Sequence, residues 1–264
     1  MLIAEKHDDV LAVKCGTEVG GKVLYWTHFY VYRNLLIDCG CPNTAREVVD
    51  LVKNLDVEIA LITHYHEDHV GAINNLKEIG IKVYAPEKSI SILKSPPEIP
   101  DYRKLVWGQP VAADCEPLDS KMEFGDTVVE VVETPGHTFD HVSILIDDFL
   151  FSGDLIISTN QMICLREEEF GDTITSLERI LKKDFEYYFG GVGIAEREYA
   201  VKYAEYVSDL RDRVKELFDA GKSIEEIVAE VFPEPPPNVL MMEAVSQKEW
   251  SRENLVRSLL GLPR

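Results

Sequence analysis

The stretch Glu58–His69 reads EIALITHYHEDH, an apolar run followed by three histidines and two acidic residues in six positions. The apolar part predicts a buried strand, and the next segment, Val70–Ile79, has the period of a helix that Gly80 ends. The polar residues His64, His66, Asp68 and His69 therefore fall on a strand-to-helix turn. Imidazole and carboxylate groups suit zinc, iron or manganese, so this turn predicts a metal site.

Outward from this turn, short strands are interleaved with helices. Apolar and β-branched runs predict strands at 11–15, 23–26, 29–32, 35–38, 81–85, 127–133, 142–146, 149–152 and 185–189. Helices are expected after Thr44 and Asp172 and over 196–219, and after capping boxes at Ser223–Glu226 and Ser246–Glu249. The proline-punctuated interval 86–126 has no clear pattern, which is typical of a lid or a pocket wall.

Composition narrows the class of partner. The 264 residues include 47 acidic and 27 basic side chains, a net charge of −20, which disfavours nucleic-acid binding and leaves a small molecule as the expected partner. No run of about 18 apolar residues predicts a membrane span, and no signal peptide is visible. The five scattered cysteines indicate reduced thiols in a cytoplasm. The oligomeric state is not readable from these features.

The pattern His-x-His-x-Asp-His after an apolar strand resembles the signature of the metallo-β-lactamase superfamily. Three more elements follow the order of that family: LLIDCG at 35–40, TPGHT at 134–138 and FSGD at 151–154. The resemblance covers about residues 10–195. It implies an α/β (α+β) fold, an αβ/βα sandwich of two mixed sheets with outer helices.

The resemblance also implies roles for individual residues. His64, His66 and His137 would form a first metal site, Asp68 and His69 would contribute to a second, and Asp154 would bridge them. One or two zinc ions are expected, with iron or manganese as other possibilities. Asp68 would also be catalytic by orienting the nucleophile or carrying its proton. His141 is expected to support the site without binding metal.

One position departs from the family pattern. The family has a last histidine in Gly-His-Gly, whereas residues 189–193 read FGGVG and place Val192 there. Valine cannot bind a metal, so the second site is expected to be weak, singly occupied, or completed by another residue such as Glu196.

The expected activity is that of a metal-dependent hydrolase in which a metal-bound hydroxide attacks a small ester, thioester or lactone. Residues 1–195 would form the catalytic domain, and 196–264 a helical extension packed on it. Three alternatives stay open. They are a mononuclear iron dioxygenase of the persulfide-dioxygenase type, a lactamase-like ribonuclease, and a binding module without catalysis.

Overall fold

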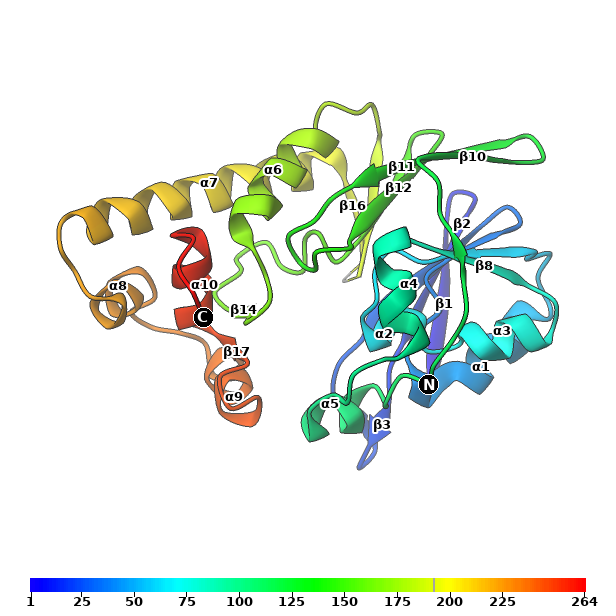
Figure 1. Cartoon of the computed structure of the whole chain (residues 1–264), viewed down its shortest axis with the longest axis horizontal. Helices are drawn as coiled ribbons and strands as arrows, with labels where there is room; N and C mark the ends of the chain where they lie inside the picture. Colours follow the sequence, from blue (N-terminus) through cyan, green and yellow to red (C-terminus); the bar gives the residue numbers. More distant parts are fainter. Residues whose placement is uncertain (192) are drawn as a thin grey trace.

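Two mixed β-sheets lie face to face with helices on their outer sides in the computed structural model, which describes residues 1–191 and 193–264 (Figure 1). The expected αβ/βα sandwich is therefore confirmed. Three clusters of buried side chains correspond to its layers. One fills the space between the sheets, and the other two lie between each sheet and its helices.

The first sheet comes from the N-terminal half. Its strand order is β1 (Leu2–His7), β2 (Val10–Cys15), β5 (Thr27–Tyr32), β6 (Leu35–Ile37), β7 (Ile59–Leu61), β8 (Lys82–Ala85) and β9 (Glu116–Pro117). The strands from β6 to β9 run parallel, and the others pair antiparallel. The connections contain a hairpin of β3 (Glu18–Val19) and β4 (Lys22–Val23), and the helices η1 (Pro42–Thr44), α1 (Ala45–Val52), α2 (Glu67–Val70), α3 (Ile73–Glu78), α4 (Glu87–Lys94) and α5 (Asp101–Val106).

The second sheet follows in the chain. Its strand order is β10 (Lys121–Phe124), β11 (Thr127–Glu133), β12 (Val142–Ile146), β13 (Phe149–Gly153), β15 (Tyr187–Gly190) and β16 (Gly193–Glu196). Outside it lie α6 (Phe170–Ile180), α7 (Arg197–Asp219), α8 (Ile224–Val231), α9 (Pro237–Val245) and α10 (Arg252–Leu259). A two-stranded ribbon of β14 (Cys164–Leu165) and β17 (Trp250–Ser251) ties the C-terminal segment to the loop after β13.

The two sheets meet at the edge where β7, β11 and β13 end. There the backbone N–H of Val142, at the start of β12, donates to the carbonyl of Thr63 at 2.9 Å. This hydrogen bond joins the residue before His64 to the second sheet, so the side chains that follow both sets of strand ends share one edge. Enzymes with parallel strands commonly place their chemistry at this edge.

Several local predictions were wrong. The interval 86–126 contains α4 and α5, which its prolines obscured. The Thr44 hydroxyl donates to the carbonyl of Cys41 and caps no helix, although α1 does start at Ala45. Ser246 ends α9, and the C-terminal helix starts instead after Ser251, whose hydroxyl accepts from the N–H of Asn254. The capping box at Ser223 is confirmed.

Candidate metal centre

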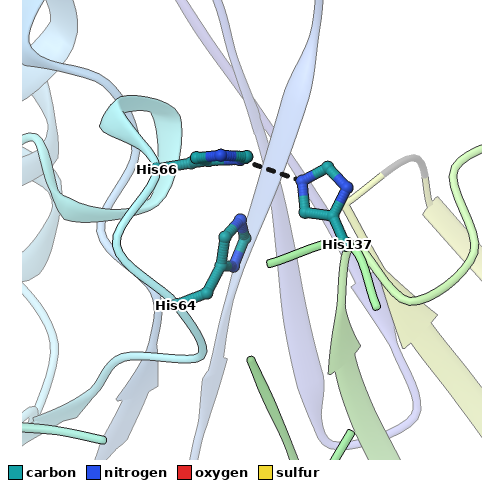
Figure 2. A group of neighbouring side chains, drawn as sticks. All are labelled: His64, His66 and His137. Carbon is teal, nitrogen blue, oxygen red and sulfur yellow. Dashed lines mark hydrogen bonds between the residues drawn. The ribbon is translucent and has the colours of Figure 1, made fainter. Parts of the chain in front are cut away.

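Three histidines from two parts of the chain converge at this edge. His64 and His66 come from the turn between β7 and α2, and His137 comes from the loop between β11 and β12 (Figure 2). One ring nitrogen from each lies within 4.8 Å of the other two, and His137 Nε2 is 2.9 Å from His66 Nδ1. The structure thus brings together the residues predicted for the first site.

A second group of potential ligands shares His64 with the first. It consists of His64, His69 and Asp154. The Oδ1 atom of Asp154 lies 3.3 Å from His69 Nε2, and its Oδ2 atom lies 3.5 Å from His137 Nε2. Asp154 therefore lies between the two groups, as a bridging ligand would. Asp68 is adjacent, with Oδ2 at 3.7 Å from His69 Nε2.

The turn that carries the histidines is held by Asp38, the residue after β6. Its carboxylate accepts hydrogen bonds from the backbone N–H of Thr63 at 2.8 Å and from the Thr63 hydroxyl, and it contacts His69 Nδ1 at 2.7 Å. Asp38 has a φ of 60°, a left-handed conformation that aspartate adopts more readily than most residues. One buried carboxylate thus orients both the turn and the imidazole of His69.

Glycines let the backbone approach Asp154 closely. Gly153 has a φ of 50°, and a Cβ there would lie 2.7 Å from both His141 Nε2 and Thr63 Oγ1. A Cβ on Gly191 would lie 1.7 Å from Asp154 Oδ1. Neither position has room for a side chain, so both glycines are needed for the observed place of the Asp154 carboxylate.

Further polar groups contact the outer nitrogens of the histidines. Glu167 Oε1 lies 3.1 Å from His66 Nε2, and Glu168 Oε1 lies 3.3 Å from His137 Nδ1. Such carboxylate–histidine pairs orient the rings of metal-bound histidines and raise their basicity. His141 belongs to neither ligand group. Its Nε2 accepts from the N–H of Asp154 at 3.1 Å, which agrees with the predicted supporting role.

Burial and neighbouring charges set the protonation of the site. Burial, together with the surrounding histidines, holds the pKa of His64 well below its usual range, so this ring is neutral, as metal binding requires. Burial alone would raise the pKa of Asp154, but the charges of His69 and His137 hold it well below its usual range. Burial raises the pKa of Asp68. The site therefore offers an ionised carboxylate, Asp154, beside a carboxylate that takes up a proton more easily, Asp68.

The donor set fits a divalent transition metal. The Nε2 atoms of His64 and His69 are buried and have no hydrogen-bond partner among the described residues, which is costly for imidazole nitrogens unless something binds them. The four histidines are almost fully buried, and imidazole with carboxylate is a ligand set for zinc, iron or manganese. The residues present therefore fit the expected metal.

Two residues bear on the missing histidine, Val192 and Glu196. Val192 lies outside the described residues. Glu196 is exposed and pairs with Tyr187 at the far end of β16, whereas Gly193 pairs with Gly190 at the end near Asp154. Three residue steps along the strand separate Gly193 from Glu196, about 10 Å. Glu196 therefore does not complete the second group, and that suggestion was wrong.

Asp38, Glu167 and Glu168 were missed as contributors to the site from the sequence. Asp38 stands inside the LLIDCG segment, so its position in a recognised element was a usable signal. Glu167 and Glu168 belong to an acidic run, REEE, which reads as an ordinary solvated loop. Only the fold brings them within reach of His66 and His137.

Among the helices that the structure describes, none combines the length and hydropathy needed to cross a membrane.

Comparison with known proteins agrees with the site. The family model described as "Metallo-beta-lactamase superfamily" matches residues 29–215. The chain is 28% identical to a Caenorhabditis elegans "Beta-lactamase-like protein 2 homolog", covering 85% of this chain and 75% of that protein. It is 30% identical to a "Hydroxyacylglutathione hydrolase" of Rhodopseudomonas palustris, covering 83% and 81%.

Solved structures show the same fold. A metallo-beta-lactamase from Pontibacter korlensis superposes with a TM-score of 0.61 at 17% identity, covering 79% of this chain and 100% of that one. The match to the family model spans well over half of the chain and includes every residue of the two ligand groups. This chain belongs to the metallo-beta-lactamase superfamily.

Proposed function

We propose that this protein is a metal-dependent hydrolase that acts on a small ester, thioester or lactone. The observation that carries the proposal is the pair of ligand groups, His64–His66–His137 and His64–His69–Asp154, three of whose residues, His66, His137 and Asp154, line a cavity. A hydrolase homologue of similar length supports the same class of reaction.

A divalent ion held by these residues supplies Lewis acidity that polarises a carbonyl and makes water nucleophilic at neutral pH. The protein's own groups do the rest. Asp68 lines the cavity, and its carboxylate can take a proton from the attacking water and return it to the leaving group. Glu167 and Asp38 hold His66 and His69 in orientation while this occurs.

Two alternatives are less well supported. A ribonuclease would need cationic groups for phosphates, but the net charge is −20, and Arg103, the one arginine on the cavity wall among the described residues, is paired with Glu67 and Glu249. A binding module without catalysis has no need of Asp68. An iron dioxygenase uses similar ligands, and metal identity separates it from a hydrolase.

We propose a cytoplasmic location on the basis of the cysteines. All five are free thiols, four of them buried, which is typical of a reducing compartment.

The test is metal analysis together with activity. Protein purified without added metal should contain zinc, hydrolyse p-nitrophenyl esters or acyl thioesters, and lose this activity with a chelator. Chelation should also lower Tm, because a ligand that binds only the folded state stabilises it. Activity that persists in fully metal-stripped protein would refute the proposal. Bound iron with oxygen consumption would favour the dioxygenase.

A further inference from the structure

The cavity above the metal-binding residues has a mostly apolar wall. Its volume is about 560 Å³, within the usual range for small-molecule sites, and its lining includes His66, Asp68, His137 and Asp154, the floor residues. The apolar side chains of the wall are Leu24, Trp107, Ile157, Met162, Ile163, Leu165, Val239, Met241, Met242 and Trp250. A substrate that reaches the floor must therefore place much of its surface against hydrocarbon, thioether and aromatic groups.

The wall offers little to an anionic group. Among the lining residues that the structure describes, Arg103 is the single lysine or arginine. Its guanidinium is buried and donates to both carboxylate oxygens of Glu67, at 2.7 and 2.8 Å, and to Glu249 at 3.2 Å. Two carboxylates already neutralise this cation, so a charged tail on the substrate would find no free cation on the wall. It would meet only uncharged polar groups, those of Tyr25, Ser158, Asn160, Gln161 and Asn238.

Helix α9 supplies Val239, Met241 and Met242 to the wall, and these residues are distant in sequence from the floor residues. Figure 1 places α9 beyond the end of α8, toward the side of the molecule where α5 and β3 lie. The cavity is lined both by α9 and by residues of the first half of the chain, such as Arg103 of α5. The pair between Arg252 Nη2 and Glu243 Oε2, at 2.8 Å, anchors the helix. Met241 and Met242 line the cavity, and Met241 is 62% exposed. Methionine side chains adapt to ligands of different shape, and exposed ones on a cavity wall favour an apolar ligand.

We propose that α9 binds the apolar acyl group of the substrate, so that the preferred substrates are esters or thioesters of medium-chain aliphatic or aryl acids with an uncharged remainder. The reaction in this inference rests on the proposed hydrolase function, but the apolar binding site follows from the lining residues of the cavity alone. Met242, which is half-buried against the cavity, is the main specificity-determining residue, with Met241 beside it.

The first measurement is kcat/KM for p-nitrophenyl acetate, butyrate and hexanoate with the metal-loaded enzyme. Each buried methylene should raise kcat/KM by roughly a factor of four. The kcat/KM for hexanoate should therefore exceed that for acetate on the order of 10²-fold. In Met242→Gln the ratio of kcat/KM for hexanoate to kcat/KM for acetate should fall about tenfold. Leu240→Gln is the matched control, because Leu240 is exposed on the same helix and does not line the cavity. A flat chain-length profile in the wild type would overturn the inference.

The second measurement does not depend on turnover. The metal-loaded protein should bind N-phenyl-1-naphthylamine, a neutral apolar fluorophore, and N-methyl octanamide should displace it better than N-methyl acetamide. Both effects should weaken in the double variant Met241→Gln, Met242→Gln and persist in Leu240→Gln, with unchanged Tm as the check on folding. Displacement that depends on chain length without hydrolysis of any ester or thioester would uphold the apolar site and refute the proposed function. Hydrolysis without such displacement would uphold the proposed function and refute the apolar site. Displacement only by an anionic thioester, such as an acylated glutathione, would also refute the apolar site.

Discussion

Part of the candidate metal centre and part of helix α9 line the same cavity, but the chain holds these two regions differently. His64, His69 and His137 are almost fully buried and follow the ends of sheet strands, with outer partners such as Asp38 and Glu168. Helix α9 has one buried residue, Val239, and exposes Leu240, Met241 and Val245. Side chains fixed on rigid elements suit chemistry that needs precise geometry, whereas a partly exposed methionine wall suits adaptable contact. Changes at the metal-binding residues should thus affect all substrates equally, and changes at α9 only those with long acyl groups.

The largest effect is expected from Asp154→Ala. Its two carboxylate oxygens lie 3.3 Å from His69 Nε2 and 3.5 Å from His137 Nε2, so the second ligand group loses a member and the first loses a neighbouring carboxylate. Metal affinity should fall by more than about 10²-fold, and hydrolysis of acetate and hexanoate esters should fall together. Elemental analysis and kcat/KM for both esters measure this. If kcat/KM fell unequally for the two esters, the candidate metal centre and the apolar wall would not act independently, contrary to the proposal.

Gly191→Ala should come next, although it removes no ligand. The new Cβ would lie 1.7 Å from Asp154 Oδ1, and the short side chain of Asp154 must turn away from the histidines. We expect the metal affinity to fall on the order of tenfold or more, with little change in overall secondary structure. Zinc titration and circular dichroism measure the two. Gly171→Ala is the control, because its Cβ would meet nothing within 4 Å. Full metal affinity in Gly191→Ala would mean that Asp154 is not held in this place.

Asp68→Ala separates binding from catalysis. Asp68 belongs to neither ligand group, so the first metal should stay bound while turnover falls about 10²-fold, the scale of a lost acid–base group. Metal content and kcat are measured on the same sample. Full turnover at full occupancy would remove Asp68 from the mechanism.

Glu167→Gln tests the outer contact of His66. The carboxylate lies 3.1 Å from His66 Nε2, and its loss should weaken metal affinity by about tenfold. A competition titration with a zinc chelator measures the change. Glu169→Gln is the neighbouring control, because Glu169 pairs with Arg264 and contacts no histidine of the site. Equal effects of the two variants on metal affinity would show that only the net charge of this loop matters, and not the contact with His66.

The smallest effect is expected from Val192→His, which restores the histidine of the family pattern. We expect the metal content to rise from about one toward two ions per chain at equal free metal, since each imidazole ligand adds appreciably to affinity. Two tightly held ions in the wild type would show that the second site needs no such residue.

Local patterns predicted single elements well but not their ends or partners. The Ser223 capping box forms as its spacing predicts, while the same kind of spacing at Thr44 and Ser246 does not, because Thr44 donates to Cys41 and the Ser246 hydroxyl accepts from Trp250. A capping motif offers the backbone one hydrogen bond among several, and tertiary packing decides which one forms. The helices α4 and α5 were missed for a related reason, because their prolines stand at or before the helix starts, where proline is tolerated. The division at residues 195 and 196 stays a prediction.

The sequence by itself determined the candidate ligand cluster and the sandwich. The ligands His64, His66 and His69 are close in the chain and share one turn, so a local conformation suffices to gather them. Only the tertiary structure decided that Asp38 supports that turn, that Glu167 and Glu168 contact His66 and His137, and that α9 forms the cavity wall. The partners of these contacts are separated by 25 to more than 100 residues, and their approach depends on how two sheets and the C-terminal helices pack. Packing energy is spread over many apolar side chains in the three buried clusters, so no short motif encodes it.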